Sequence, residues 1–226
     1  MNVIIPHILH VKRNMSNARI MDEMTASPSP LRKEPAQQRS KERVERMLAA
    51  ASALIAERGS DAMRMAEVAE RADVSIGSLY QFFPDKAAII RALAERYTAA
   101  ARACIDEALA EVADLGGLLT AFGSLLDTYY AICLAEPVMR DIWSATQADK
   151  PLRELELADS RASARTLVDA WRRVRPEADT EALSSAAFLI WQLGEATMRL
   201  AVSVDRAEGD RLVAAYKRMA LRELAI

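Results

Sequence analysis

The sequence contains little glycine, and half of its prolines lie before residue 38. Only 7 glycines occur among 226 residues, and they form neither a dinucleotide-binding pattern nor a P-loop. Long segments without glycine or proline, rich in alanine, leucine, glutamate and arginine, favour helices over strands. The expected fold class is therefore all-α, and an α/β nucleotide-binding fold is not expected.

The scarcity of cysteine and histidine limits the chemistry of the chain. Its 2 cysteines, Cys104 and Cys133, cannot form a disulfide framework, which suits a reducing cytoplasm. Its 2 histidines, His7 and His10, lie in an N-terminal segment without hydrophobic periodicity. A histidine-based triad or metal centre is not expected in the folded part, and we predict no cofactor, no metal and no catalytic residue.

The N-terminal segment differs in composition from the rest of the chain. Residues 1–38 collect proline, serine, asparagine and charge, so a disordered tail is predicted there. Its apolar start is too short to span a membrane and lacks the features of a secretory signal. We expect a cytoplasmic protein with no membrane partner and two helical domains, a smaller one at residues 39–98 and a larger one at residues 99–226.

Hydrophobic periodicity and turn residues predict a helix-turn-helix in the smaller domain. A first amphipathic helix begins near Ser40, a second short one covers residues 65–71, and a third begins at Ser75. Ala69 supplies a small residue where the short helices would cross. Asp73 supplies the turn residue, although it suits positive φ less well than glycine.

The segment 74–86, which reads VSIGSLYQFFPDK, resembles the DNA-binding head of the tetracycline-repressor (TetR) family of bacterial transcriptional regulators. The resemblance extends in detail over residues 57–93 and in outline over the helical remainder. It implies a head joined to a larger ligand-binding and dimerisation domain. It further implies a ligand-responsive repressor, not an enzyme, that binds a palindromic double-stranded DNA operator as a homodimer and is released by an unknown small-molecule inducer.

The resemblance assigns DNA-binding positions residue by residue. The implied set is Arg64, Ser75, Ile76, Gly77, Ser78, Tyr80, Gln81, Phe82 and Lys86. The positions that commonly touch DNA in the family, chiefly its phosphates, are Ser75, Ser78, Tyr80 and Lys86. Residues that vary with the operator stand at Ile76, Gln81 and Phe82. Gln81 suits pairing with adenine and Ile76 suits a thymine methyl group. Three residues depart from those the family often has, namely Arg64 for threonine, Asp73 for glycine and Phe82 for histidine.

The charge of the head needs explanation, because DNA affinity depends largely on phosphate neutralisation. Residues 41–100 carry equal numbers of basic and acidic side chains. We expect the acidic side chains to point elsewhere and the cations to gather on the DNA side. The cations concerned are Lys41, Arg43, Arg46, Arg64 and Lys86, with Arg32, Lys33 and Arg39 of the tail.

Most bulky side chains lie in the larger domain. A helix predicted to begin near residue 85 leads into this domain, and further helices are predicted up to residue 224. Gly116 and Gly117 are expected to interrupt the chain. Bulky residues at helical spacing form the core of any helical bundle. In this chain the same residues either form such a core or line a ligand cavity. The candidate pocket residues are Phe122, Tyr129, Tyr130, Met139, Trp143, Trp171, Trp191 and Met198. The polar candidates for orienting a ligand are Thr146, Gln147, Gln192 and Glu195.

The last two predicted helices carry apolar faces that contain small residues, which permit close helix approach. The faces consist of Leu183, Ala187, Ile190, Gly194 and Ala201, then of Leu212, Ala215, Tyr216 and Met219. They predict either a homodimer through these helices or packing within one chain. A dimer would place two recognition helices roughly 34 to 36 Å apart, matching successive major grooves.

A rival from another class is an all-α carrier or enzyme whose helix-turn-helix serves as an interaction module. Carboxylate pairs such as Glu154 and Glu156 are its only candidate catalytic groups. The sequence shows no nucleophile with a base and no metal-ligand spacing to support it.

Overall fold

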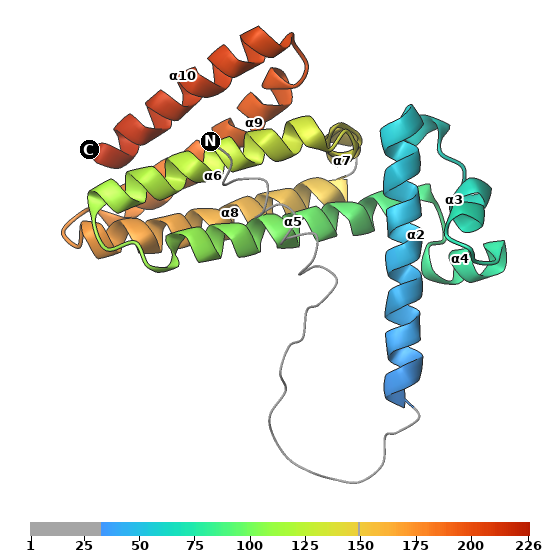
Figure 1. Cartoon of the computed structure of the whole chain (residues 1–226). Coiled ribbons are helices and arrows are strands. Elements are labelled where there is room, and N and C mark those ends of the chain that lie inside the picture. The colour runs from blue at the N-terminus through green and yellow to red at the C-terminus, as the bar shows by residue number, and fades with distance from the viewer. Residues whose placement is uncertain (1–32, 149) are drawn as a thin grey trace, which may run out of the picture.

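The computed structural model describes residues 33–148 and 150–226, and predictions that concern residues 1–32, including His7 and His10, lie outside this part of the chain. Within the described residues every regular element is a helix, which confirms the all-α fold class. The helices form a small head beside a longer helical body, joined by one shared helix (Figure 1).

The head consists of α2 (Lys33–Ala62), α3 (Met65–Arg71), α4 (Ile76–Phe82) and the start of α5 (Lys86–Ala110). Helix α2 begins at Lys33, earlier than the start near Ser40 that the sequence predicts. Proline is tolerated in the first turn of a helix, where its missing N–H has no partner to lose, and Pro35 lies there.

The tight turn between α3 and α4 has the geometry that its residues predict. Asp73 adopts φ 53°, and the Val74 N–H donates to the carbonyl oxygen of Ala69 at 3.0 Å. The Ser75 Oγ accepts a hydrogen bond from the Ser78 N–H at 3.1 Å and thereby caps α4. Ala69 and Leu79 are buried at the crossing, which confirms the helix-turn-helix.

The body consists of the remainder of α5 with α6 (Leu115–Ala135), α7 (Val138–Ala148), α8 (Lys150–Val174), α9 (Thr180–Ala201) and α10 (Arg206–Ala225). Gly116 and Gly117 do not interrupt the chain as predicted. They lie in the first turn of α6, because the Asp114 Oδ1 accepts from the Gly117 N–H at 2.7 Å and caps the helix.

Helix α6 is the most apolar of the described helices, with a mean hydropathy of 1.4 over its most apolar window. By length and composition alone it passes the test for a membrane span, a test that core helices also pass. Leu118, Phe122 and Cys133 of α6 are almost fully buried. The helix contacts α5, α8, α9 and α10, and therefore serves as a core helix of the bundle.

The apolar faces predicted for dimer formation pack against each other within the chain. Ala187, Ile190 and Gly194 of α9 are buried, and the Tyr216 hydroxyl of α10 donates a hydrogen bond to the Ile190 carbonyl oxygen. Met219 differs, since 66% of it is exposed. Of the two arrangements that the sequence predicts for these faces, their buried members show the packing within one chain.

A turn at the end of α2 connects the head to the body, and we call it the head–body junction. Gly59 has φ 78°, which favours glycine, and interrupts the helical geometry. The Ser60 N–H donates to the Asp141 Oδ1 of α7 at 2.7 Å. The Lys86 Nζ donates to the carbonyl oxygens of Ser60 at 2.9 Å and of Asp61 at 3.4 Å. Three helices thus meet at one turn.

Replacing Gly209 by alanine should destabilise the body. A Cβ at this position would lie 2.3 Å from the Ala201 carbonyl oxygen, a backbone atom that no rotamer change can move. We expect Gly209→Ala to lower the free energy of unfolding by at least about 1–3 kcal/mol, measured by urea denaturation. Gly77→Ala is the matched control, because a Cβ there meets no atom within 4 Å. Equal stability of the Gly209→Ala and wild-type proteins would contradict this packing.

Candidate nucleic-acid interface

The outer face of α4 presents side chains to solvent beside the capped turn. Ile76 is 43% exposed and Tyr80 is 49% exposed, although large apolar and aromatic groups are usually covered. Gln81 is exposed next to them. The amide of Gln81, the hydroxyl of Tyr80 and the apolar Ile76 give this face both hydrogen-bonding groups and an apolar contact for base edges.

Gly77 and Phe82 lie on different sides of α4, one open to solvent and the other turned partly toward the head core. A Cβ at Gly77 would meet nothing within 4 Å, so the backbone of α4 is open to close approach there. Phe82 is half-buried and packs against the head core, because it follows the buried Leu79 by three residues. The outward orientation predicted for Phe82 is therefore only partly realised.

One arginine of α2 contacts α4, and another stands at the N-cap of α3. The Arg43 Nη1 donates to the Ser78 Oγ at 3.4 Å, which joins α2 to α4. Arg64 precedes α3, and its N–H donates to the Glu67 Oε2 at 3.3 Å. In a capping box, a threonine or serine hydroxyl at this position would also accept a hydrogen bond from the Glu67 backbone N–H. The arginine side chain has no acceptor atom and cannot make this second bond.

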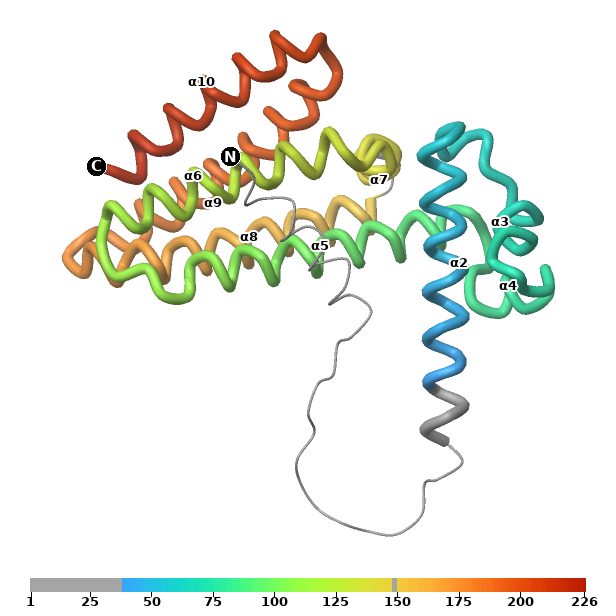
Figure 2. Tube along the Cα trace, in the orientation of Figure 1, coloured from blue at the N-terminus to red at the C-terminus, as the bar shows by residue number. Residues whose placement is uncertain are grey.

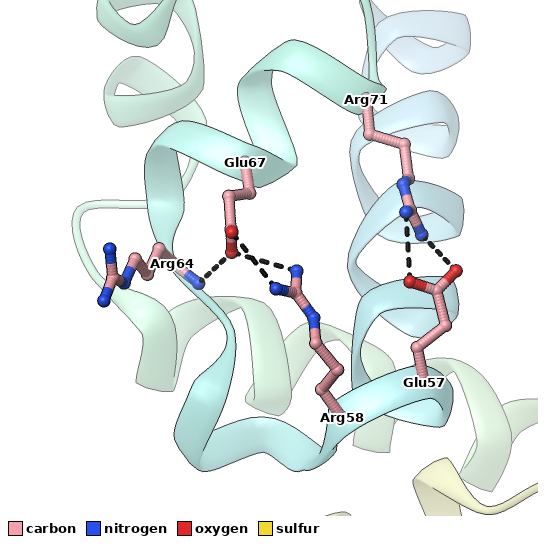
Figure 3. Close-up of polar contacts among 5 residues, drawn as sticks. All are labelled: Glu57, Arg58, Arg64, Glu67 and Arg71. Carbon is pink, nitrogen blue, oxygen red and sulfur yellow. Dashed lines mark hydrogen bonds and ion pairs between the residues drawn. The ribbon is translucent and has the colours of Figure 1, made fainter.

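Two ion pairs near the end of α2 neutralise the carboxylates of Glu57 and Glu67 (Figure 3). The Arg58 Nη2 lies 3.2 Å from the Glu67 Oε2, and the Arg71 guanidinium donates to both Glu57 oxygens at 2.6 and 3.0 Å. The hydrogen bond from Arg71 lowers the pKa of Glu57. The guanidinium of Arg64 points away from both pairs and is exposed, so its charge is directed outward.

The resemblance implies a Lys86 side chain that is free to bind a DNA phosphate, whereas the structure shows it bonded within the protein. Its Nζ bonds the Ser60 and Asp61 carbonyl oxygens in the head–body junction. An ammonium group has three hydrogens, so a third donor position is left for a further oxygen. The structure therefore gives Lys86 a structural role beside any contact with DNA.

Comparisons with known proteins agree with this geometry. The family model described as "Bacterial regulatory proteins, tetR family" matches residues 47–93, and "Tetracyclin repressor-like, C-terminal domain" matches residues 116–226. This chain belongs to the TetR family. The two matches cover both the helix-turn-helix of the TetR head and the helical body.

Curated relatives of this TetR-family chain match a short part of it. The HTH-type transcriptional repressor KstR of Rhodococcus jostii is 47% identical over 58 residues, which cover 25% of this chain and 27% of that one. KstR of Mycolicibacterium smegmatis is 48% identical over 46 residues, which cover 20% of this chain and 22% of that repressor. The matched segments thus span about a quarter of those repressors.

Solved TetR-family structures are similar over most of the chain. A TetR-family transcriptional regulator from Streptomyces coelicolor has 28% identity and a TM-score of 0.59, covering 82% of this chain and 96% of that one. RolR, solved with resorcinol, has 23% identity and a TM-score of 0.55, covering 84% of this chain and 95% of its own. The second likeness shows the shared fold.

The predicted pocket residues of this TetR body lie mostly in its core. Six of them are buried, namely Phe122, Tyr130, Met139, Trp143, Trp171 and Met198. Tyr129 and Trp191 are half-buried, and the Trp191 ring meets the Phe122 ring edge-on at a centroid distance of 6.0 Å. Their role as a ligand pocket stays a prediction.

Two open hollows lie on the surface of the body. One of about 420 Å³ is lined by Tyr130, Leu134, Arg206 and neighbouring residues, and one of about 310 Å³ lies between α8 and α9 beside Arg161 and Phe188. Of the predicted pocket residues, only Tyr130 lines either of them. Among the described side chains, no three or more histidine, cysteine, aspartate or glutamate groups are arranged to hold a metal ion.

A polar cluster lies between α8 and α9 inside the body. The Arg199 Nη1 is 3.4 Å from the Glu156 Oε1 and 3.9 Å from the Glu195 Oε2. Burial and the neighbouring Glu156 carboxyl raise the pKa of Glu195, although Arg199 opposes the shift. Burial likewise raises the pKa of Tyr129 and of Cys133, which both lie near Glu195. Sequence analysis named Glu195 as a polar candidate and Glu156 only with Glu154 in the carrier or enzyme alternative. It missed Arg199, whose helical spacing is that of a solvent-exposed face.

The raised pKa of Glu195 predicts a pH-dependent stability that glutamine would remove. A carboxyl with a raised pKa in the folded state stabilises the fold below its unfolded pKa, and this contribution is lost as the pH rises through the folded value. Glu195→Gln cannot ionise, so its stability relative to wild type should increase from pH 5 to pH 8, by about 1 kcal/mol or more in chemical denaturation.

Glu154→Gln is the matched control for this experiment. Glu154 lies on α8 with its side chain 67% exposed, in an ion pair with Lys150 of a kind that contributes little. It should change stability by less than about 1 kcal/mol at either pH. A constant difference between Glu195→Gln and wild type over the same pH range would contradict the raised pKa.

Proposed function

We propose that this chain is a ligand-responsive transcriptional repressor that binds a palindromic DNA operator as a homodimer and releases it when a small-molecule inducer binds. The observation that carries the proposal is the exposed outer face of α4, held by a capped and tightly packed helix-turn-helix. The KstR relatives are repressors, and they match this chain over 58 and 46 residues. RolR and SmeT, solved with resorcinol and triclosan, share the fold over most of the chain.

In this proposal the residues of the interface have distinct tasks. Gln81 and Ile76 read base edges in the major groove, because they lie exposed on α4. Arg64, Ser75, Ser78, Tyr80 and Lys86 contact the DNA backbone and set the orientation of the head. The domain division proposed at residues 98 and 99 falls within α5, so one continuous helix leads from the head into the body (Figure 2).

The dimer is proposed to form through the outer faces of the last two helices. Leu189, Leu193 and Leu200 lie exposed on α9 at spacings of four and seven residues, and Met219 is exposed on α10. An apolar row of this kind is typical of a contact surface between subunits. A twofold dimer presents two copies of α4 to the two halves of a palindrome.

The inducer is proposed to act through α7. Trp143 of α7 lies beside the Tyr129 hydroxyl, and Asp141 of the same helix accepts the hydrogen bond from Ser60 in the head–body junction. A ligand that moves Trp143 would move Asp141 as well, since both belong to one short helix. Such a ligand lowers operator affinity only if it binds the altered conformation more tightly, and DNA then lowers ligand affinity equally.

Operator binding tests the proposed function directly. The purified protein should bind DNA from upstream of its own gene tightly, with an affinity that falls steeply as salt increases. Gln81→Ala should relax preference at one base pair by about 1–3 kcal/mol, measured with a panel of operator variants. Tyr80→Ala should weaken binding to all variants alike. Absence of binding by a folded dimer would favour the carrier alternative instead.

A charged residue in the apolar row of α9 should prevent dimer formation. We expect Leu193→Glu to shift the protein from dimer to monomer in analytical ultracentrifugation, because the glutamate would be buried unpaired at the interface. Leu155→Glu is the control, since Leu155 is exposed to a similar extent, 39% against 44%, but lies on α8. Dimers of unchanged affinity in Leu193→Glu would place the interface elsewhere.

A further inference from the structure

A row of arginines follows one face of α2 beside the helix-turn-helix. Arg39, Arg43 and Arg46 occur at i, i+4 and i+7, a spacing that places side chains on the same face of a helix. The Arg43 Nη1 donates to the Ser78 Oγ of α4 at 3.4 Å. The Arg46 Nη1 lies 3.9 Å from the Asp73 carboxylate in the turn before α4. These two contacts show that the row faces the start of α4.

Helix α2 is longer than the head core requires. Its buried side chains begin at Met47, whereas Gln38, Arg39 and Lys41 are exposed. The helix continues past α3 and α4 on the side away from the body (Figures 1 and 2). At a rise of about 1.5 Å per residue, Arg39 lies roughly 6 Å farther along α2 than Arg43. The arginine row therefore extends beyond the surface that α4 presents.

The acidic side chains of this segment are engaged in other contacts. The Glu45 Oε2 lies 2.7 Å from the Arg96 Nη1 of α5, on another side of the helix. The Glu42 Oε1 accepts a hydrogen bond from the Gln38 Nε2 at 2.9 Å. The Glu45 carboxylate thus points toward α5, whereas Arg43 and Arg46 contact α4 and the turn before it.

We propose that Arg39 and Arg43 bind phosphates of the operator backbone next to the base pairs that α4 reads, which makes the projecting start of α2 a second DNA-contacting element. The inference rests on the proposed function, because the same DNA must lie against α4. Guanidinium groups match phosphate oxygens in charge and in geometry. The contact between Arg43 and Ser78 makes the cationic surface continuous with the surface of α4.

The dependence of operator affinity on salt tests this inference. Each phosphate contact contributes about 0.9 to the slope of log K against log salt concentration, so Arg39→Gln should reduce that slope by about two in a symmetric dimer. Arg43→Gln should act similarly. Preferences among operator variants should stay as in the wild type, because phosphate contacts carry no direct sequence information. Hydroxyl-radical footprints should lose protection of the backbone at the flanks.

Arg172→Gln is the matched control, because it removes an exposed arginine from the last turn of α8 in the body. Its slope should equal that of the wild type. If the wild type and Arg39→Gln bind with the same slope and the same footprint, the inference is overturned while the proposed function stands. If the folded wild type binds no DNA at any salt concentration, the proposed function fails and this inference fails with it. Arg39 is exposed, so the thermal unfolding of Arg39→Gln should match that of the wild type.

Discussion

The turn at the end of α2 is the constraint on which the relation between head and body depends. Gly59 releases the chain from helical geometry, and both polar backbone groups of Ser60 are then held by side chains, the N–H by Asp141 and the carbonyl oxygen by Lys86. Backbone groups in partly buried positions need such partners. Because Lys86 begins α5 and Asp141 belongs to α7, movement of either helix acts on the same turn.

The head achieves a polarised surface with equal numbers of acidic and basic residues. Glu57 and Glu67 are occupied by Arg71 and Arg58, and Glu45 is occupied by Arg96. Exposed ion pairs of this kind contribute little to stability. Their main effect here is to neutralise acidic side chains and so to determine where positive charge is presented on the surface. With these carboxylates engaged elsewhere, outward arginines such as Arg43 and Arg64 suit a polyanion partner better than the net charge suggests, while Arg46 lies 3.9 Å from the Asp73 carboxylate.

The body combines an apolar bundle with a group of partly buried carboxyl and guanidinium side chains. Removing Glu156, Glu195 and Arg199 partly from water costs desolvation energy that apolar residues of similar volume would avoid. Such a cluster is more easily explained by recognition or switching than by stability. Its nearness to Tyr129, and through Trp143 to α7, places it on the side of the bundle from which the head–body junction is reached.

The sequence by itself determined the helices, the turn at Asp73 and the residues of α4 that face outward, because these depend on spacing, capping and backbone conformation within a few residues. Tertiary structure decided the rest. Only packing shows that Lys86 bonds carbonyl oxygens, that Phe82 turns partly inward and that the faces around Ile190 and Tyr216 meet within one chain. Only packing also brings Glu156, Glu195 and Arg199 together, since helical periodicity indicates which residues share a face but not which face of another helix covers them.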